Sequence, residues 1–147
     1  MNKLFKKNKF LIGMIPLDPL HGYPTSPDIK ELIKDAINDL DALTRAGFDG
    51  VLVENDNDRP HLINVTDEIK DSFIEIASEV LKKSHIPVGI QILYDMPLTL
   101  KVADKIGAHF VRLDVFVDDV ITKWGKILAN TEELIKIRNL GNNKFSL

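Results

Sequence analysis

The chain has 147 residues, of which 44% are hydrophobic and 28% are charged. This length and composition are typical of one globular domain and exclude a disordered or fibrous chain. The formal net charge is -3, so no overall positive field favours nucleic acid or an anionic membrane. The chain has no cysteine, which excludes disulfides and thiolate metal sites and favours a reducing compartment, the cytoplasm.

The first apolar run covers residues 10–17, which is too short to span a bilayer. No small-residue cleavage pattern follows it, so neither a signal peptide nor a transmembrane segment is predicted. We interpret residues 10–15 as the first β-strand, ended by Pro16.

A helix pattern follows the first predicted strand. Ser26 is the predicted N-cap, with Pro27 at the first helical position, where its missing N–H costs nothing. Apolar side chains then recur every three or four residues from Ile29 to Leu43, which indicates one buried helix face. Gly47 is the predicted C-terminal cap.

Three more strand-helix units are predicted from short apolar runs followed by helix patterns. The predicted strands are residues 50–54, 88–93 and 109–115. The predicted N-caps of the helices are Thr66, Asp95 and Asn130, the last with Glu133 in a capping-box pattern. Gly107 and Gly141 end two of these helices, and residues 118–129 form a polar connection before the last one.

Strands that alternate with helices indicate the α/β class with a parallel sheet, because each helix returns the chain to the same end of the sheet. Residues 47–54 and 107–114 share a pattern in which a glycine cap precedes a strand that ends in an acid. In a barrel this repeat would put Glu54 and Asp114 at matching heights. An open doubly wound sheet is the competing architecture, although the first turn lacks a glycine-rich phosphate-binding motif.

A complete TIM barrel needs eight such units and about 250 residues. The four units found here predict a single truncated half-barrel domain over residues 1–147, with residues 142–147 at the start of a fifth strand. Such a half-barrel is expected either to form a homo-oligomer or to pair with a separate C-terminal half-barrel chain, because its edges are unpaired.

The candidate site lies where parallel strands end, since α/β sheets and barrels bind ligands at the carboxyl ends of their strands. The candidate catalytic residues are Glu54, Arg112 and Asp114, and the candidate ligand-binding residues are Asn55, Asp58 and Gln91. A buried Arg112 would recognise an anion or a carbonyl group, with Glu54 or Asp114 as general base. The alternative is an ion pair that only organises the strand ends.

The loop after the second strand is rich in carboxylates and amides. A divalent cation held by Glu54, Asp56 and Asp58 is one interpretation, and an Asx-rich turn is the other. The four histidines lack the mutual spacing of a zinc site, so no metal and no cofactor is assigned.

Four segments together resemble the N-terminal half of the BtpA family: GMIPLDPLHGYPTSP, AGFDGVLVENDNDRP, PVGIQIL and FVRLDV. That family is named for an accessory protein of photosystem I biogenesis and is expected to adopt a TIM barrel. Family members usually carry a histidine where this chain has Pro16, and often an asparagine where it has Gln91 or Asp114.

The resemblance implies a TIM-barrel protein descended from an enzyme that bound a small polar or phosphorylated metabolite. It also leaves two alternatives open. One is a non-catalytic accessory protein for the assembly of a photosystem or membrane complex, and the other is a vestigial gene fragment.

Overall fold

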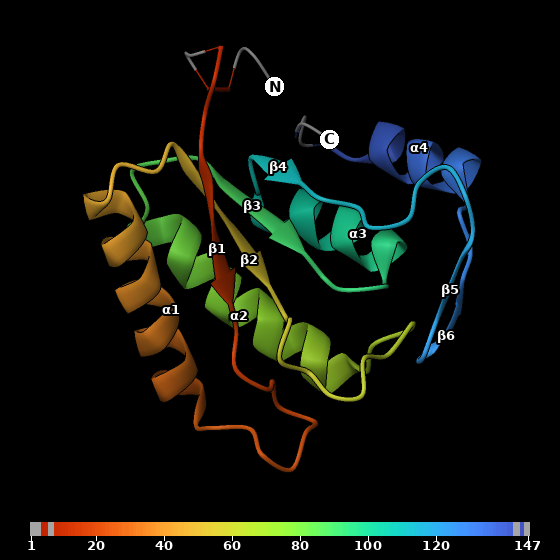
Figure 1. The fold of residues 1–147 in the computed structure, drawn as a ribbon, viewed down its shortest axis with the longest axis horizontal. Coiled ribbons are helices and arrows are strands. Elements are labelled where there is room, and N and C mark those ends of the chain that lie inside the picture. The colour runs from red at the N-terminus through yellow and green to blue at the C-terminus, as the bar shows by residue number, and fades with distance from the viewer. Residues whose placement is uncertain (1–3, 6–7, 143–144, 146–147) are drawn as a thin grey trace.

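A four-stranded parallel sheet forms the centre of the molecule. The computed structural model describes residues 4–5, 8–142 and 145. The strands pair in the order β1 (Ile12–Pro16), β2 (Gly50–Glu54), β3 (Val88–Gln91) and β4 (Phe110–Val111). The helices that follow them are α1 (Ile29–Arg45), α2 (Asp67–Lys83), α3 (Met96–Ile106) and α4 (Thr131–Leu140) (Figure 1). The predicted α/β class, with parallel strand-helix units, is confirmed.

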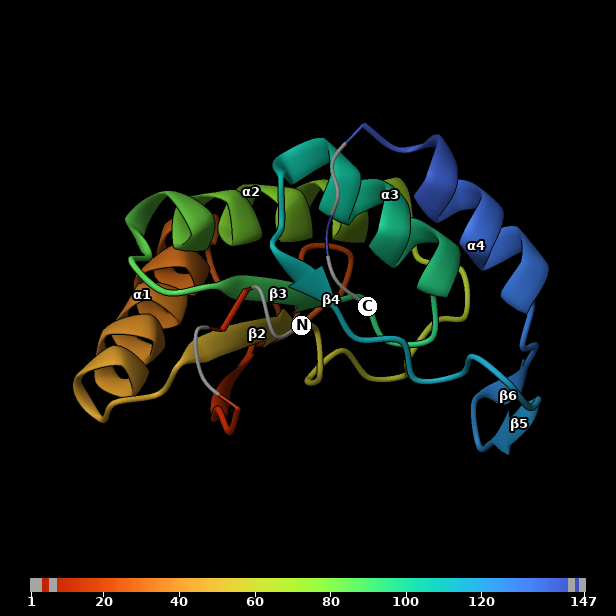
Figure 2. The same ribbon diagram turned by 90° about the horizontal axis from the view of Figure 1, so that it is seen from above.

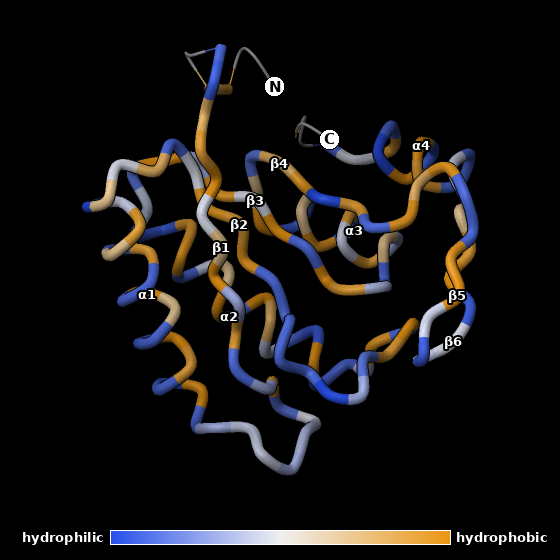
Figure 3. The backbone as a smooth tube through the Cα atoms, viewed as in Figure 1, coloured by the Kyte–Doolittle hydropathy of each residue, from blue (hydrophilic) through white to orange (hydrophobic). Residues whose placement is uncertain are grey.

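The two faces of the sheet have different surroundings. Figure 2 shows α2 and α3 together on one side of the sheet. Side chains that point toward this helical layer, such as Ile15, Val53 and Ile90, are fully buried. In Figure 3 the hydrophobic colour recurs at intervals along α1, where the buried residues Leu32 and Ala36 are four positions apart. The main core therefore lies between the strands and the helices.

The other face, which we call the inner face, carries the alternate strand residues. They include Met14, Leu52, Glu54, Gln91 and Phe110. Near the amino ends of the strands, Phe5, Leu52 and Phe110 form a second buried cluster. Phe5 stacks on Phe10 at 4.3 Å between ring centroids and meets Phe110 edge to face at 5.7 Å. The amino-terminal segment thus covers one end of the inner face.

Of the four predicted N-caps, two make the expected hydrogen bond and one is wrong. The fourth, Asn130, is the N-cap residue of α4, but its side chain makes no capping hydrogen bond, so the predicted capping box does not form. Thr66 and Asp95 accept hydrogen bonds from Ile69 N and Leu98 N, as their predicted N-cap roles require. The prediction that Ser26 caps α1 is wrong, because α1 begins two residues later and Asp28 Oδ1 accepts from Lys30 N at 2.9 Å. An aspartate at this position supplies both the acceptor and a negative charge at the helix N-terminus.

The third and fourth strands are shorter than predicted. β3 ends at Gln91 because Ile92 N donates to Thr99 Oγ1 of α3, and Tyr94 then turns the chain with a φ of 66°. β4 keeps only two residues. β1 ends at Pro16 as predicted, with the proline as its last residue, and it begins at Ile12, two residues later than predicted. An edge strand tolerates the missing N–H of a proline.

The polar connection at 118–129 contains an unpredicted hairpin. Its strands are β5 (Val120–Thr122) and β6 (Gly125–Ile127). Thr122 Oγ1 accepts from Trp124 N at 3.1 Å, and Gly125 takes the left-handed φ of 132° that the turn requires. Strands of three residues are too short for their alternation to be recognised in a sequence.

The end of the chain, where a fifth strand is predicted, is described only in part. Of residues 142–147, the structure describes Asn142 and Phe145, and neither lies in a strand. The predicted fifth strand otherwise falls outside the described residues and stays a prediction.

Within the described ranges, no helix is both long and apolar enough to cross a membrane.

Candidate functional site

A row of side chains crosses the inner face at the carboxyl ends of the strands. Pro16, Glu54 and Gln91 are register partners in β1, β2 and β3. Arg112 follows β4, and its backbone N donates to Ile90 O at 3.3 Å, so it continues the same register. Arg112 is therefore in register with Glu54 and Gln91. The predicted match in height between Glu54 and Asp114 refers to the axis of a closed barrel and stays a prediction.

Arg112 contacts two carboxylates, Glu54 and Asp114. Its Nη2 atom lies 2.9 Å from Glu54 Oε2, and its Nε atom lies 3.8 Å from Asp114 Oδ1. The structure thus brings together the three residues predicted as catalytic. The Arg112 side chain is 47% exposed, against 9% for Glu54, so the prediction of a buried arginine is wrong. β4 ends before Arg112, which leaves its side chain at the rim of the sheet.

The surroundings of the Glu54 carboxyl group raise its pKa. Burial raises its pKa above the ordinary value, the Arg112 guanidinium opposes that shift, and the charges of Asp56 and Asp114 add to it. A carboxylate with a raised pKa is a better proton acceptor near neutral pH than an ordinary one. This environment is compatible with the general-base role predicted for Glu54, which stays a prediction.

Asn55 and Asp58 connect loops inside the protein. Asp58 Oδ1 accepts from Leu20 N at 2.9 Å and Asp58 Oδ2 accepts from Asn55 Nδ2 at 2.8 Å. Asn55 Oδ1 accepts from Leu93 N at 2.7 Å. Asn55 is 2% exposed and Asp58 is 1% exposed. Their predicted ligand-binding role stays a prediction, and the geometry gives both a role in tying the loops after β1, β2 and β3 together.

The carboxylates of the suggested cation site do not converge. Asp58 uses its two oxygens for the bonds to Leu20 and Asn55, while Glu54 faces Arg112. Asp56 is half exposed and lies 3.8 Å from Arg59. In the part of the chain that the structure describes, no group of three His, Cys, Asp or Glu side chains could hold a metal ion. The cation interpretation remains untested.

Three aromatic rings from three different loops contact one another. His61 lies edge to face with Tyr94 at 5.3 Å and with Trp124 at 6.0 Å between ring centroids. Burial lowers the pKa of His61, and the charge of Arg59 lowers it further, so the neutral ring is favoured. The sequence analysis did not include Trp124 among the candidate site residues, because it did not predict the hairpin that carries it. The one signal that could have pointed to it is the presence of the chain's single tryptophan in an otherwise polar connection.

Parallel strands that pair in chain order, each followed by a helix, have the arrangement of the N-terminal half of a TIM barrel. A solved structure of this type, 7,8-dihydropteroate synthase from Vibrio fischeri, superposes with a TM-score of 0.61 at 15% identity. The match covers 95% of this chain and 47% of that structure, and it shows the fold alone. The chain belongs to the BtpA family, whose model matches residues 7–146, so the resemblance found in the sequence is confirmed.

Two relatives show how much of the family's length is present. An uncharacterised protein of Pyrococcus furiosus is 33% identical, and the match covers 95% of this chain and 54% of the relative. The photosystem I biogenesis protein BtpA of Synechocystis is 31% identical, over 91% of this chain and 48% of that protein. The chain thus spans about half the length of these relatives.

Proposed function

We propose that the chain carries the anion-binding part of an enzyme-type barrel site for a small polar or phosphorylated metabolite. In this proposal Arg112 binds the anionic group of the metabolite, Asp114 orients the guanidinium, and Glu54 is the general base. The observation that carries the proposal is the contact of 2.9 Å between Arg112, directly after β4, and Glu54, the last residue of β2, at the carboxyl edge of the sheet. A half-exposed arginine beside a buried carboxylate can bind an anion and move a proton within one site.

The experiment is a ligand titration of the chain and its Arg112→Ala variant. Thermal shift and two-dimensional NMR with inorganic phosphate and a panel of phosphorylated and carboxylated metabolites should show binding to the unmodified chain. Arg112→Ala should abolish that binding and change the free energy of unfolding by about 1 kcal/mol or less. Arg45→Ala, which removes an exposed arginine from α1, is the matched control.

The structural alternative gives a different pattern. If the ion pair only organises the strand ends, Arg112→Ala should cost about 3–5 kcal/mol because the buried Glu54 carboxylate loses its partner. No binding would then be lost, since none would be present. Melting curves and titrations on the same samples therefore separate the two roles.

A second function, a non-catalytic role in assembling a membrane complex, is supported by the similarity to the Synechocystis photosystem I biogenesis protein. For either function we propose a cytoplasmic location and a barrel completed by a second half, from another copy or from a C-terminal chain. A metabolite screen that finds no ligand, with and without such a second half, would favour the assembly role.

A further inference from the structure

Gln91 is an unusual residue in the polar row. It is 1% exposed, and its Oε1 atom is buried without a hydrogen-bond partner among the described residues. Buried polar atoms of native proteins nearly always have a partner, so each exception calls for an explanation. An amide oxygen accepts hydrogen bonds, and the missing partner is therefore a donor.

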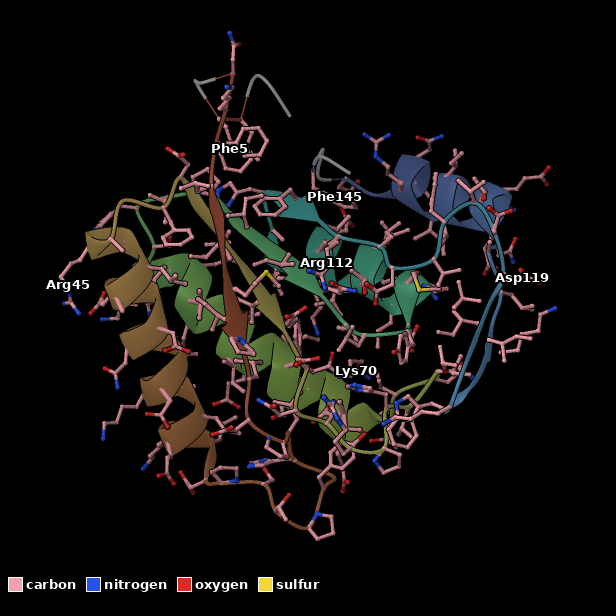
Figure 4. The ribbon with its side chains drawn as sticks, in the orientation of Figure 1. Phe5, Arg45, Lys70, Arg112, Asp119 and Phe145 are labelled. Atoms are coloured by element: carbon pink, nitrogen blue, oxygen red, sulfur yellow. The ribbon has the colours of Figure 1, made fainter. Side chains whose placement is uncertain are left out.

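The position of Gln91 explains how it is covered. Strand β3 lies between β2 and β4, and Gln91 is level with Glu54 on the inner face. Arg112 comes from the far side of β3 and reaches Glu54 across this strand. The guanidinium therefore passes over Gln91 (Figure 4 labels Arg112 near the middle of the molecule). A ligand bound to Arg112 meets Gln91 directly beside it.

Arg112 still has donors to offer. Its contact with Glu54 uses Nη2, while Nε is 3.8 Å from Asp114 and Nη1 is 3.9 Å from the Met14 sulfur. The contact of Nε with Asp114 exceeds the length of an ordinary hydrogen bond between nitrogen and oxygen, and the Met14 sulfur is only a weak acceptor for Nη1. An anion approaching the exposed side of the guanidinium can take these donors and draw Arg112 away from Gln91.

We infer that this site selects small anions that carry a hydroxyl or amino group beside the charged group, and that Gln91 Oε1 accepts the hydrogen bond from that group. The inference rests on the proposed function of Arg112. Neighbouring strands are about 4.8 Å apart, so the two contacts fit one small molecule whose donor is a few atoms from its anionic group. The Glu54 carboxylate beside Gln91 is a second acceptor for the same donor.

The test compares three anions of similar size by NMR titration of the full chain. Acetate has no donor beside its carboxylate, glycolate has a hydroxyl group, and glycine has an amino group. Glycolate or glycine should bind about tenfold more tightly than acetate, since a site built for a hydrogen bond discriminates against a ligand that lacks it. The tighter of the two identifies the donor.

Gln91→Met is the decisive variant because methionine keeps the length of the side chain and removes the amide. It should abolish the preference over acetate and leave the affinity for acetate unchanged. Its melting temperature should equal or exceed that of the unmodified chain, because a buried atom without a partner is removed. Gln91→Leu provides the same comparison if the methionine variant does not fold.

The outcomes separate this inference from the proposed function. A preference that survives in Gln91→Met, or equal binding of acetate, glycolate and glycine to the unmodified chain, overturns the role of Gln91 and leaves the role of Arg112 intact. Absence of binding by all three anions, or binding that survives Arg112→Ala, overturns both.

Discussion

The ring of Phe110 occupies the space above Gly89 that a side chain would need. A Cβ atom on Gly89 would lie 2.2 Å from Phe110 Cε2, and the two residues are register partners in β3 and β4. The same ring touches Phe5 at its other side. A residue without a side chain in β3 therefore allows an aromatic ring from β4 to fill the inner face.

Gly89→Ala should destabilise the protein by about 1–3 kcal/mol, since the added methyl group overpacks the site and displaces the ring. Urea unfolding followed by circular dichroism measures this. Phe110→Leu in the same chain should recover part of the loss. Equal costs of Gly89→Ala with and without Phe110→Leu would show that the ring does not oppose the methyl group.

Asp58→Ala should destabilise the protein by about 2–4 kcal/mol, because Leu20 N and Asn55 Nδ2 lose their acceptor inside the protein. Asp56→Ala, at a half-exposed carboxylate two positions earlier, should stay within about 0.5 kcal/mol. Chemical denaturation of both variants gives the comparison. Similar losses for the two would contradict the loop-connecting role of Asp58.

The raised pKa of Glu54 predicts a pH dependence of stability. The folded chain holds the Glu54 proton more tightly than the unfolded chain, whose value is near 4.5, so this residue's stabilising contribution is present below that pH. It is lost as the pH rises through the folded pKa. Glu54→Gln should therefore flatten the decline of stability from pH 4.5 upward, measured by urea unfolding at several pH values. An unchanged slope would mean that the pKa of Glu54 is not raised.

The open inner face predicts self-association. β1 pairs with β2 along one edge, and no described strand pairs with its other edge. A hollow of about 250 Å³ on this face is lined by Ile12, Met14, Leu52, Phe110, Val111 and Arg112. Unpaired edges beside apolar surface favour association. Size exclusion with light scattering should show oligomers.

Met14→Lys should shift this equilibrium toward the monomer, because it places a charge on the inner face beside the free edge. Ile135→Lys, at an exposed apolar position on α4, is the control and should leave the association unchanged. A stable monomer of the unmodified chain that binds no hydrophobic dye would contradict the prediction.

The sequence by itself determined the local and periodic features. The 3.6-residue spacing from Ile29 to Leu43 specified α1, and Thr66 and Asp95 specified two helix starts, because these signals act within one turn of the chain. The alternation of these helix patterns with short apolar runs was sufficient to predict the parallel sheet. The rule that ligands bind at strand carboxyl ends then placed Glu54, Gln91 and Arg112 in one neighbourhood.

Only the tertiary structure decided the contacts between segments distant in sequence. The register of the strands placed Arg112 beside Glu54, 58 positions away in the sequence. It also brought Asp58 and Asn55 within hydrogen-bond distance of Leu20 and Leu93, which lie in the loops after β1 and β3. The hairpin at Trp124 gains its order from packing against the loop after β2, where Ile63 meets Gly125. Hydrogen bonds and packing between remote residues depend on how the strands align, and no local pattern in the sequence encodes that alignment.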